Sequence, residues 1–293
     1  MRVLADWGTT NLRGWLVDDQ GVVLARYQSD KGLRKSVDLG FGQVFEGLIE
    51  SLGAHADTPA LISGMVGSSI GWHEVPYTPT PANAPAIAAT ALPIPERANT
   101  WIIGGVNHQG DAGPEVMRGE EVQALGVMQQ HPDAHWLCLP GTHTKWVQLE
   151  NGSIRSFTTY MTGELYRWVT QESLIATQIQ GDDFDAEAFA LGQQLAQQHA
   201  ALTSAVFQLR TRFLSGELRA DQVASAASGL LIQHELDAAT RVLEGTVYLC
   251  GADTVVKPYA LALQAGGIRS QSVDPEQAVI AGLHVLQTLI EAK

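Results

Sequence analysis

Two glycine-threonine turns in this sequence could bind a chain of phosphate groups. In the first, an apolar strand runs into Gly8-Thr9-Thr10, and in the second another apolar strand runs into Gly141-Thr142. Glycine lets the backbone approach a bulky anion, and threonine hydroxyls together with turn N–H groups supply a cluster of donors. Two such turns, far apart in the chain, predict a phosphate chain held from two sides.

The composition is typical of a folded enzyme with enough chain for two lobes. The 293 residues are 45% hydrophobic and 17% charged, which disfavours disorder driven by charge. The formal net charge of −13 argues against a nucleic-acid partner, because such a partner requires a basic surface. An anionic ligand must therefore be held by local donors.

The cysteines and the first residues indicate a cytoplasmic protein. Cys138 and Cys250 each lie in an apolar run, which implies neither a disulfide framework nor a zinc cluster and fits a reducing compartment. The sequence starts directly with a strand pattern, and no apolar run reaches the length of a membrane span. We therefore expect neither export nor a membrane partner.

The apolar patterns predict related arrangements of strands in the two halves of the chain. Strands are expected over residues 2–5, 12–17, 22–27, 60–62 and 101–103 in the first half, and over 136–139, 144–149, 153–158 and 246–249 in the second. Each half contains a strand, a turn and a further strand in succession. This repetition indicates an α/β protein of two related lobes, 1–114 and 115–293.

Helices and loops are expected between these strands. Helical spacing predicts a helix over residues 37–52 and a mostly helical region over 165–242, with breaks at Gly181-Asp182-Asp183 and Ser215-Gly216. Residues 76–95 and the segment from 104 to 114 are expected to be loops. Asp274 followed by Pro275 predicts the start of a final helix over 275–291, which is expected to pack back on the first lobe.

Four motifs resemble those of the 2-dehydro-3-deoxygalactonokinase family, and the likeness extends over nearly the whole chain. They are Asp6-Trp7-Gly8-Thr9-Thr10, Met117-Arg118-Gly119-Glu120-Glu121, Leu139-Pro140-Gly141-Thr142-His143-Thr144-Lys145 and Met161-Thr162-Gly163-Glu164-Leu165. The first also resembles a phosphate motif of sugar kinases with the actin and hexokinase fold. The resemblance implies two ribonuclease H-like lobes with a cleft between them.

The resemblance implies transfer of the γ-phosphoryl group of ATP to a sugar-acid hydroxyl. In this interpretation Asp6 holds Mg²⁺ through its carboxylate, a hard oxygen ligand. Phosphate contacts would come from both turns, with added charge from an arginine and an adenosine contact near a third glycine turn. The residues implied are Gly8, Thr9, Thr10, Arg13, Gly141, Thr142, Thr144, Gly251 and Ala252.

The general base is expected to be a carboxylate. Gly119-Glu120-Glu121 is similar to a Gly-Asp-Gln segment of related carbohydrate kinases, which places Glu120 at their catalytic aspartate. The side chain here is one methylene longer, so Glu121 stays a rival for the base and is otherwise a candidate substrate contact. Arg118 is the third candidate catalytic residue beside Glu120 and Asp6.

Two segments are candidates for binding the sugar acid. Residues 63–68 follow a buried strand and would expose backbone donors, which makes Ser63, Gly64, Met65 and Gly67 candidates. Lys31 belongs to the densest basic cluster of this acidic chain, residues 31–35, and could meet the substrate carboxylate. A solvated loop is the alternative interpretation of that cluster.

Other functions fit less well. Gly67-Ser68-Ser69-Ile70-Gly71 has the spelling of a hydrolase nucleophile elbow, but the flanking strand and helix are missing from the pattern. His131 and His135 have metal-like spacing, yet Pro132 disfavours the helix that would align them. An ATP-driven actin-like switch and a kinase for the gluconate-derived epimer remain alternatives, and the oligomeric state stays open.

Overall fold

The computed structural model describes residues 1–181, 183–240 and 243–292. These residues form two compact units, which are described separately below. Unit 1 comprises Met1–Ala134, Val147–Phe157 and Asp274–Lys293, and unit 2 comprises His135–Trp146 and Thr158–Val273. The chain therefore enters unit 1 three times, which differs from the single boundary near residue 114 that the sequence suggested.

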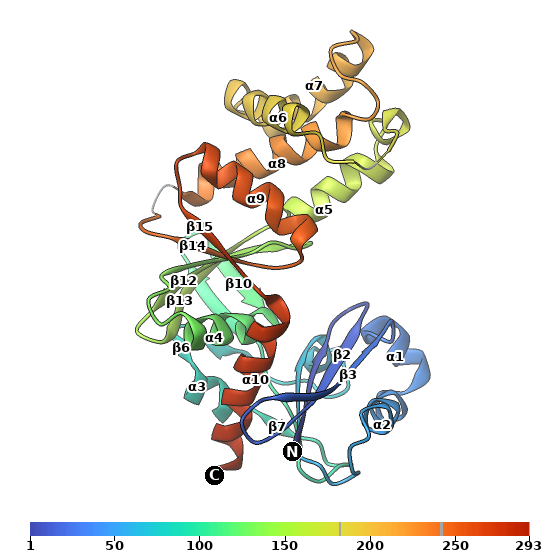
Figure 1. The fold of residues 1–293 in the computed structure, drawn as a ribbon, viewed down its shortest axis with the longest axis vertical. Coiled ribbons are helices and arrows are strands. Elements are labelled where there is room, and N and C mark those ends of the chain that lie inside the picture. The colour runs from blue at the N-terminus through green and yellow to red at the C-terminus, as the bar shows by residue number, and fades with distance from the viewer. Residues whose placement is uncertain (182, 241–242, 293) are drawn as a thin grey trace. The chain divides into compact units, whose positions relative to one another are not determined.

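A six-stranded sheet of order β3-β2-β1-β4-β8-β7 forms the first layer of unit 1 (Figure 1). Its strands are β1 (Arg2–Trp7), β2 (Leu12–Val17), β3 (Val23–Ser29), β4 (Ala60–Gly64), β7 (Leu92–Pro93) and β8 (Thr100–Ile102). β1 runs antiparallel to β2 and parallel to β4. The five strands predicted in the first half of the chain are thus confirmed, and β7 is an addition at the edge.

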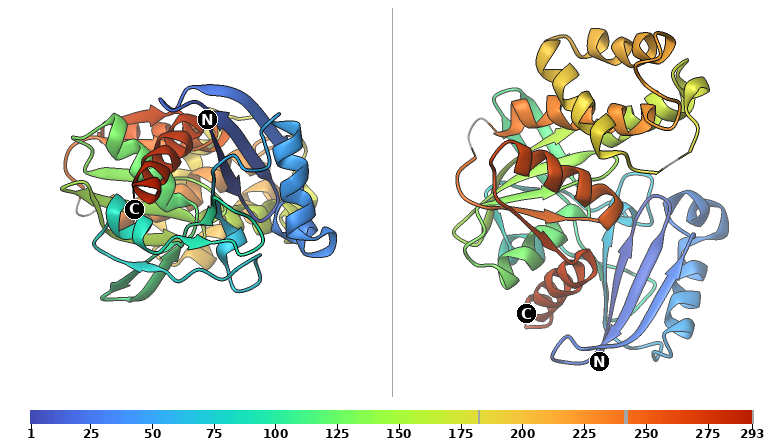
Figure 2. Two further views of the ribbon diagram at one scale, coloured as in Figure 1. Left: turned by 90° about the horizontal axis from the view of Figure 1, so that it is seen from below. Right: turned by 45° about the horizontal axis from the view of Figure 1, so that its top comes forward.

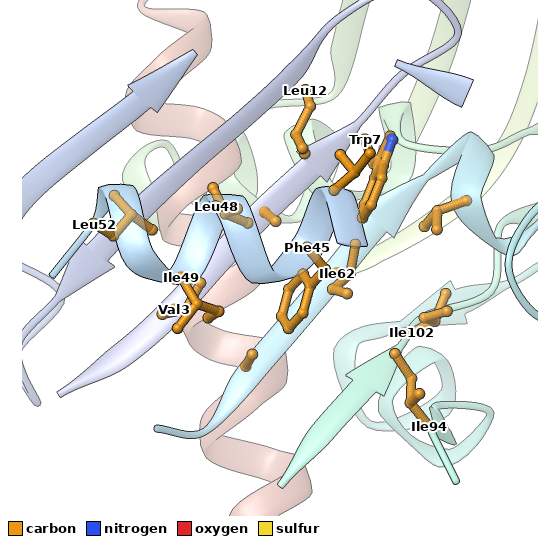
Figure 3. Packing of buried hydrophobic residues seen from close by; sticks show 14 of the residues in the cluster. Val3, Trp7, Leu12, Phe45, Leu48, Ile49, Leu52, Ile62, Ile94 and Ile102 are labelled. Carbon is orange, nitrogen blue, oxygen red and sulfur yellow. The ribbon is translucent and has the colours of Figure 1, made fainter. Parts of the chain in front are cut away.

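Alternate residues of β1 face opposite sides of this sheet. Val3, Ala5 and Trp7 belong to a core cluster that also contains Phe45 and Leu48 (Figure 3). Because successive side chains of a strand point to opposite faces, Asp6 lies on the other face from this core. The hydrophobic face thereby fixes the direction of the carboxylate at the end of β1.

Two helices, α1 (Leu33–Leu39) and α2 (Phe41–Ser51), replace the single helix predicted over residues 37–52. The interruption is Gly40, whose φ of +86° lies outside the helical region. The first helix begins earlier than predicted because the carbonyl of Gly32 accepts from the N–H groups of Lys35 and Ser36. α2 lies along the sheet of β1, β2 and β3 (Figure 2).

The loop predictions for residues 76–95 and 104–114 were wrong in part. The first segment contains β5 (Thr78–Pro79), β6 (Ala82–Asn83) and α3 (Ala84–Ala89), and the second contains most of a hairpin of β9 (Val106–Gly110) and β10 (Gly113–Met117). Proline misled the prediction, because proline is compatible with a first helical turn and with edge strands. Asn83 caps α3 by accepting from the N–H of Ala86 at 2.9 Å.

Helices α4 (Glu120–Gln130) and α10 (Pro275–Glu291) of unit 1 cross with their backbones in close contact. A Cβ added to Gly126 would lie 1.8 Å from the carbonyl oxygen of Ala278, and one added to Gly282 would lie 2.0 Å from that of Val122. The predicted N-cap of α10 is confirmed, since the Asp274 carboxylate accepts two backbone N–H groups. This crossing fixes the position of the amino-terminal end of α4.

We expect Gly282→Ala to destabilise unit 1, because the new methyl group would overlap a backbone oxygen that cannot rotate away. Overpacking of this kind costs about 1–3 kcal/mol, which exceeds the gain of about 1 kcal/mol from alanine's helix propensity. Gly47→Ala on α2 is the matched control, because no atom lies within 4 Å of its added Cβ. Thermal unfolding should show a lower Tm for Gly282→Ala and an equal or higher Tm for Gly47→Ala; equal Tm values in both would contradict the packing.

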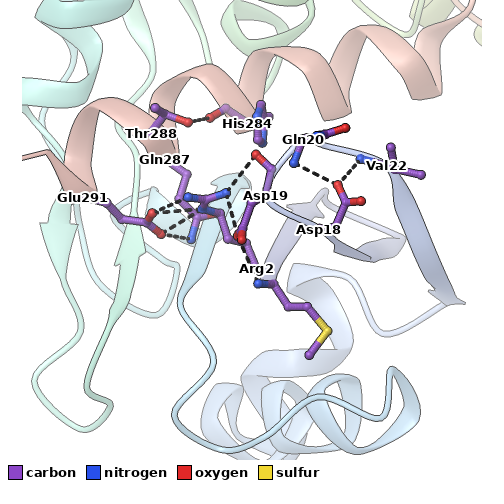
Figure 4. A network of polar contacts seen from close by, with 10 residues as sticks. Arg2, Asp18, Asp19, Gln20, Val22, His284, Gln287, Thr288 and Glu291 are labelled. Atoms are coloured by element: carbon purple, nitrogen blue, oxygen red, sulfur yellow. Dashed lines mark hydrogen bonds and ion pairs between the residues drawn. The ribbon is translucent and has the colours of Figure 1, made fainter.

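A polar network joins the start of β1 to the end of α10 within unit 1 (Figure 4). The Nε of Arg2 donates to a Glu291 oxygen at 2.9 Å, and its Nη1 lies 3.4 Å from an Asp19 oxygen. Exposed ion pairs of this kind add little stability. Their value here is to fix the register of α10 against the sheet.

A second six-stranded sheet has the order β15-β14-β11-β12-β13-β6. Its remaining strands are β11 (Trp136–Leu139), β12 (Thr144–Glu150), β13 (Ser153–Tyr160), β14 (Val247–Cys250) and β15 (Ser270–Val273). The four strands predicted for the second half are therefore confirmed. β11 runs parallel to β14, which brings the turn after β11 and the turn after β14 to the same edge.

Unit 2 contains β11, β14 and β15 of this sheet, and helices make up most of its remainder (Figure 1). They are α5 (Thr162–Arg167), α6 (Ala186–Gln198), α7 (Leu202–Leu214), α8 (Val223–Ala239) and α9 (Asp253–Ala265), with short π and 3₁₀ segments at Trp168–Glu172 and Ala176–Gln178. The largely helical region was predicted; Asp182 in one expected break and Val242 at its end lie outside the described residues. Among the described helices, none has the length and apolar character needed to span a bilayer.

Candidate active site

The first glycine-threonine turn joins β1 to β2 in unit 1. Its carbonyl groups, those of Gly8, Thr9 and Thr10, each accept from an N–H of residues 32–34, at 2.9 to 3.2 Å. Within the described residues, the N–H groups of Thr9 and Thr10 have no backbone acceptor. The turn is therefore held by its carbonyls and by the N–H of Gly8, which donates to the carbonyl of Asn11 at 2.9 Å. The N–H groups of Thr9 and Thr10 are left for a ligand, as a phosphate-binding turn requires.

Asp6, at the end of β1, is paired with Arg13 on β2. One Asp6 oxygen, Oδ2, lies 2.5 Å from Nη2 and 3.2 Å from Nε of Arg13. A Cβ added to Gly119 would lie 3.9 Å from the other oxygen, Oδ1. The same Cβ would lie 3.5 Å from the Cα of Gly64. Both glycines have positive φ, so the backbones meet here without side chains and leave room beside the carboxylate.

Two glutamates open helix α4 beside these glycines. Glu120 accepts from the N–H of Arg118 at 3.0 Å, and Glu121 accepts from the N–H of Gly119 at 2.7 Å. Glu121 is fully buried, and its other oxygen, Oε1, has no hydrogen-bond partner among the described residues, whereas Glu120 is half-buried. Burial first, and the neighbouring Glu120 charge second, raise the pKa of Glu121 to about 8.

This raised pKa predicts that Glu121 makes the folded chain less stable as the pH rises. The folded chain keeps the proton up to about pH 8, while the unfolded chain releases it near 4.5, the ordinary pKa of a glutamate side chain. Between these values the free energy of unfolding falls by about 1.4 kcal/mol per pH unit on account of this group.

We therefore expect Glu121→Gln to flatten the dependence of Tm on pH across that window. Glu50→Gln, at an exposed position of α2, is the control and should keep the wild-type slope. Melting curves of the three proteins measured from acid to mildly alkaline pH provide the comparison. Identical slopes for wild type and Glu121→Gln would show that the carboxyl of Glu121 titrates normally.

Arg118 contacts the segment 67–77, which follows β4. Its Nη2 donates to the carbonyl of Val75 at 2.9 Å, and its guanidinium lies 4.3 Å from the centre of the Tyr77 ring. A Cβ on Gly67 would lie 2.9 Å from its Nη1, so this glycine leaves the space that the guanidinium fills. In this geometry Arg118 holds the loop that carries the predicted substrate residues.

The predicted substrate residues lie in two places. Ser63 is buried, and its hydroxyl donates to the carbonyl of Ala5 at 3.3 Å, so the side chain holds β4 against β1. Gly64, which adjoins Gly119, and Gly67 are buried, and Met65 is half-buried. Lys31 is exposed and precedes the residues that bind the carbonyls of the first turn. The basic cluster thus lies beside the first phosphate turn.

The second glycine-threonine turn and the Gly251 turn meet in unit 2. A Cβ on Gly251, at the end of β14, would lie 3.2 Å from the carbonyl of Pro140, and one on Gly163 would lie 2.1 Å from the carbonyl of Gly141. The carbonyl of Thr142 accepts from the N–H of Glu164 at 2.9 Å. Gly141 and Thr142 remain exposed, and residues 163 and 164 hold them in place by packing and by a hydrogen bond.

A cavity of about 810 Å³ lies next to this turn within unit 2. Pro140, Gly141 and Gly163 line part of it, and the remaining lining comes from α5, α8, α9 and Phe184, with Ser228 and Tyr259 among its polar residues. Ala252 is the N-cap residue of α9, and α9 forms one wall of the cavity. A mostly apolar hollow with a few polar groups, beside a phosphate-type turn, has the size and character of a nucleoside site.

Glu235 of α8 is a buried carboxylate that accepts hydrogen bonds from three side chains near this cavity. It accepts from the Trp146 indole at 2.6 Å, from the Tyr259 hydroxyl at 2.7 Å and from the Thr162 hydroxyl. Because Tyr259 donates to Glu235, the Thr144 hydroxyl, 2.9 Å away, donates to Tyr259. Burial raises the pKa of Glu235, and the three donors partly offset that effect.

This network changes the expected role of Thr144. The residue is fully buried with its hydroxyl bound to Tyr259, so its side chain supports the second turn instead of facing the solvent. Sequence reasoning also missed Glu235 and Tyr259. The motif around Thr162 was a partial signal, because its threonine donates to Glu235.

The donor set near Asp6 is compatible with magnesium bound together with phosphates. Among the described residues, no group of three or more His, Cys, Asp or Glu side chains could hold a metal ion alone. Mg²⁺ typically takes one or two carboxylates and completes its shell with water and substrate phosphates. The single carboxylate of Asp6, beside the first turn, fits this pattern.

Comparisons with known proteins agree with the motifs. The chain is 34% identical to a probable 2-dehydro-3-deoxygalactonokinase of Rhizobium meliloti (strain 1021), over 95% of this chain and 94% of the relative. It is 31% identical to the 2-dehydro-3-deoxygalactonokinase of Escherichia coli (strain K12), over 96% and 95% of the two chains.

Structure gives the same result. A crystal structure assigned to a 2-dehydro-3-deoxygalactonokinase protein from Sinorhizobium meliloti matches with a TM-score of 0.92 and 31% identity, over 98% of each chain. The predicted actin/hexokinase-like α/β fold is thereby confirmed. The family model described as 2-keto-3-deoxy-galactonokinase matches residues 6–286. This chain belongs to the 2-keto-3-deoxy-galactonokinase family.

Proposed function

We propose that this chain transfers the γ-phosphoryl group of ATP to the terminal hydroxyl of 2-dehydro-3-deoxygalactonate, giving the 6-phosphate. Family membership over residues 6–286 carries this proposal. The exposed donors of the first turn and the cavity beside the second turn support it, because a kinase needs sites for phosphates and for a nucleoside. Mg²⁺ as the metal and the cytoplasm as the site of action are parts of the same proposal.

The nucleotide is assigned to both glycine turns. Unit 2 would hold adenosine in the cavity bordered by Gly141 and by α9, whose N-cap residue is Ala252, with Gly251 and Thr144 supporting the turns. Thr142 would donate to phosphate oxygens from this side. Unit 1 would add the N–H donors of Thr9 and Thr10, and Gly8, whose own N–H donates to the carbonyl of Asn11, would let the backbone approach the phosphates. Arg13, paired with Asp6, would supply positive charge.

Glu120 is assigned as the general base that accepts the proton of the attacking hydroxyl. Two observations favour it over Glu121. Glu120 is partly accessible, whereas Glu121 is fully buried, and the raised pKa of Glu121 keeps that carboxyl protonated at neutral pH. Magnesium, held next to Asp6 when bound, would neutralise charge on the phosphates.

The acceptor is assigned to the segment 64–67, in which Met65 is half-buried and Gly64 and Gly67 are buried. Arg118 holds this loop from beneath, and Ser63 fixes its start on β4. Lys31 would contribute positive charge toward the acid group of the sugar.

An assay of ADP formation against a panel of acceptors tests the proposed function. The panel contains the galactonate-derived acid, its gluconate-derived epimer and neutral hexoses. We expect strong acceleration by the galactonate-derived acid and little by hexoses. Slow ATP hydrolysis that no acceptor accelerates would favour an ATP-driven switch, and preference for the epimer would replace the named substrate.

A further inference from the structure

We propose that the ammonium group of Lys145 binds an anionic oxygen of one of the substrates, either the carboxylate of the acceptor or the transferred phosphoryl of ATP. The inference deepens the proposed kinase function and rests on it. Lys145 lies on β12, directly after Thr144 of the second turn. It is the only lysine or arginine among the buried described residues, with 5% of its surface exposed.

The surroundings of this lysine do not balance its charge. Its Nζ donates to the Thr159 hydroxyl at 3.0 Å, which is a neutral partner. No carboxylate within the described part of the chain lies within ion-pair distance, 4.0 Å, of Nζ. A buried cation is costly unless an anion accompanies it, and an ammonium group has three donors to satisfy.

Strand alternation indicates which anion this is. Thr144 and Trp146 both join the Glu235 network, on the face of β12 toward the nucleoside cavity. Lys145 lies between them and therefore faces the opposite side of the strand. Its anion is accordingly not part of the adenosine region, and the candidates are an anionic group of each substrate, the acceptor carboxylate and the transferred phosphoryl.

This assignment makes a prediction that a structural role would not. An ammonium group without a counterion destabilises the ligand-free protein, so replacing it by an apolar chain of similar length should not lower stability. If Lys145 instead serves to hold Thr159 by its hydrogen bond, its replacement should lower the free energy of unfolding. Lys145→Met therefore separates a ligand-binding role from a structural one.

The experiment compares wild type, Lys145→Met and Arg155→Met. Arg155, exposed on β13 and paired with Glu150 at 3.5 Å, is the control for loss of one positive charge. For Lys145→Met we expect kcat/KM for the sugar acid to fall about ten- to a hundredfold, as for a lost charge-assisted hydrogen bond. The Tm without ligands should be unchanged or higher, and Arg155→Met should behave as wild type.

The kinetic pattern identifies the source of the anion. A raised KM for the sugar acid with unchanged kcat assigns the carboxylate, whereas a lowered kcat with unchanged KM for the sugar acid assigns the transferred phosphoryl. Unchanged kinetics, a lowered Tm, or failure of Lys145→Met to fold would each overturn the proposal. If wild type phosphorylates no sugar acid, the proposed function fails, and Lys145 is then judged by whether inorganic phosphate raises the Tm of wild type but not of Lys145→Met.

Discussion

Glu120→Gln is expected to lower kcat at least about a hundredfold while ATP still binds, which is the usual size of a general-base contribution. The substitution keeps the length of the side chain and an oxygen that can accept from the Arg118 N–H, so the start of α4 should be preserved. The measurements are turnover with the sugar acid and, separately, the affinity for ATP.

Glu50→Gln on α2 is the control for loss of one carboxylate at an exposed position. Glu121→Gln is the informative companion, because its carboxyl adjoins that of Glu120 in sequence but is buried. A hundredfold loss in Glu121→Gln with normal turnover in Glu120→Gln would transfer the role of base to Glu121. Normal turnover in both variants would remove the start of α4 from the chemistry.

Asp6→Asn is expected to reduce kcat by about a hundredfold and to raise the Mg²⁺ concentration needed for half-maximal rate. The physical reason is that an amide lacks the charge that draws a hard cation, and metal-assisted charge neutralisation is worth several kcal/mol. A magnesium titration of the initial rate at saturating ATP measures both effects.

Arg13→Gln provides the matched control for this prediction. Arg13 contacts the same carboxylate at 2.5 Å, so its replacement breaks the ion pair but keeps the charge of Asp6. The magnesium requirement should then remain close to that of wild type. A normal requirement in Asp6→Asn, or the same shift in both variants, would contradict the assignment of Asp6 to the metal.

The sequence allowed prediction of the features that are local. The strand, turn and strand around Gly8 and around Gly141 were found because hydrophobic alternation and turn residues lie within one short segment. The N-cap of α10 at Asp274 was found for the same reason, since the two N–H groups that donate to its carboxylate belong to Glu276 and Gln277, within the same short segment. Each of these needs no knowledge of distant parts of the chain.

Features made by distant residues could not be predicted in this way. Glu235 lies 89 residues from Trp146 and 73 from Thr162, so neither its burial nor its partners can be read from its neighbours. Burial likewise separates Glu121 from Glu120, although both follow Gly119 and look alike in the sequence. The broken helix at Gly40 and the elements among the prolines show that turn residues also occur inside structured segments.

Identification of the reaction product tests the central claim most directly. Wild-type protein is incubated with ATP, Mg²⁺ and 2-dehydro-3-deoxygalactonate, and the product is examined by phosphorus NMR and mass spectrometry. We expect one new phosphomonoester on the terminal carbon, formed in equal amount to ADP. ADP accompanied by inorganic phosphate alone, with the sugar acid unchanged, would contradict the account.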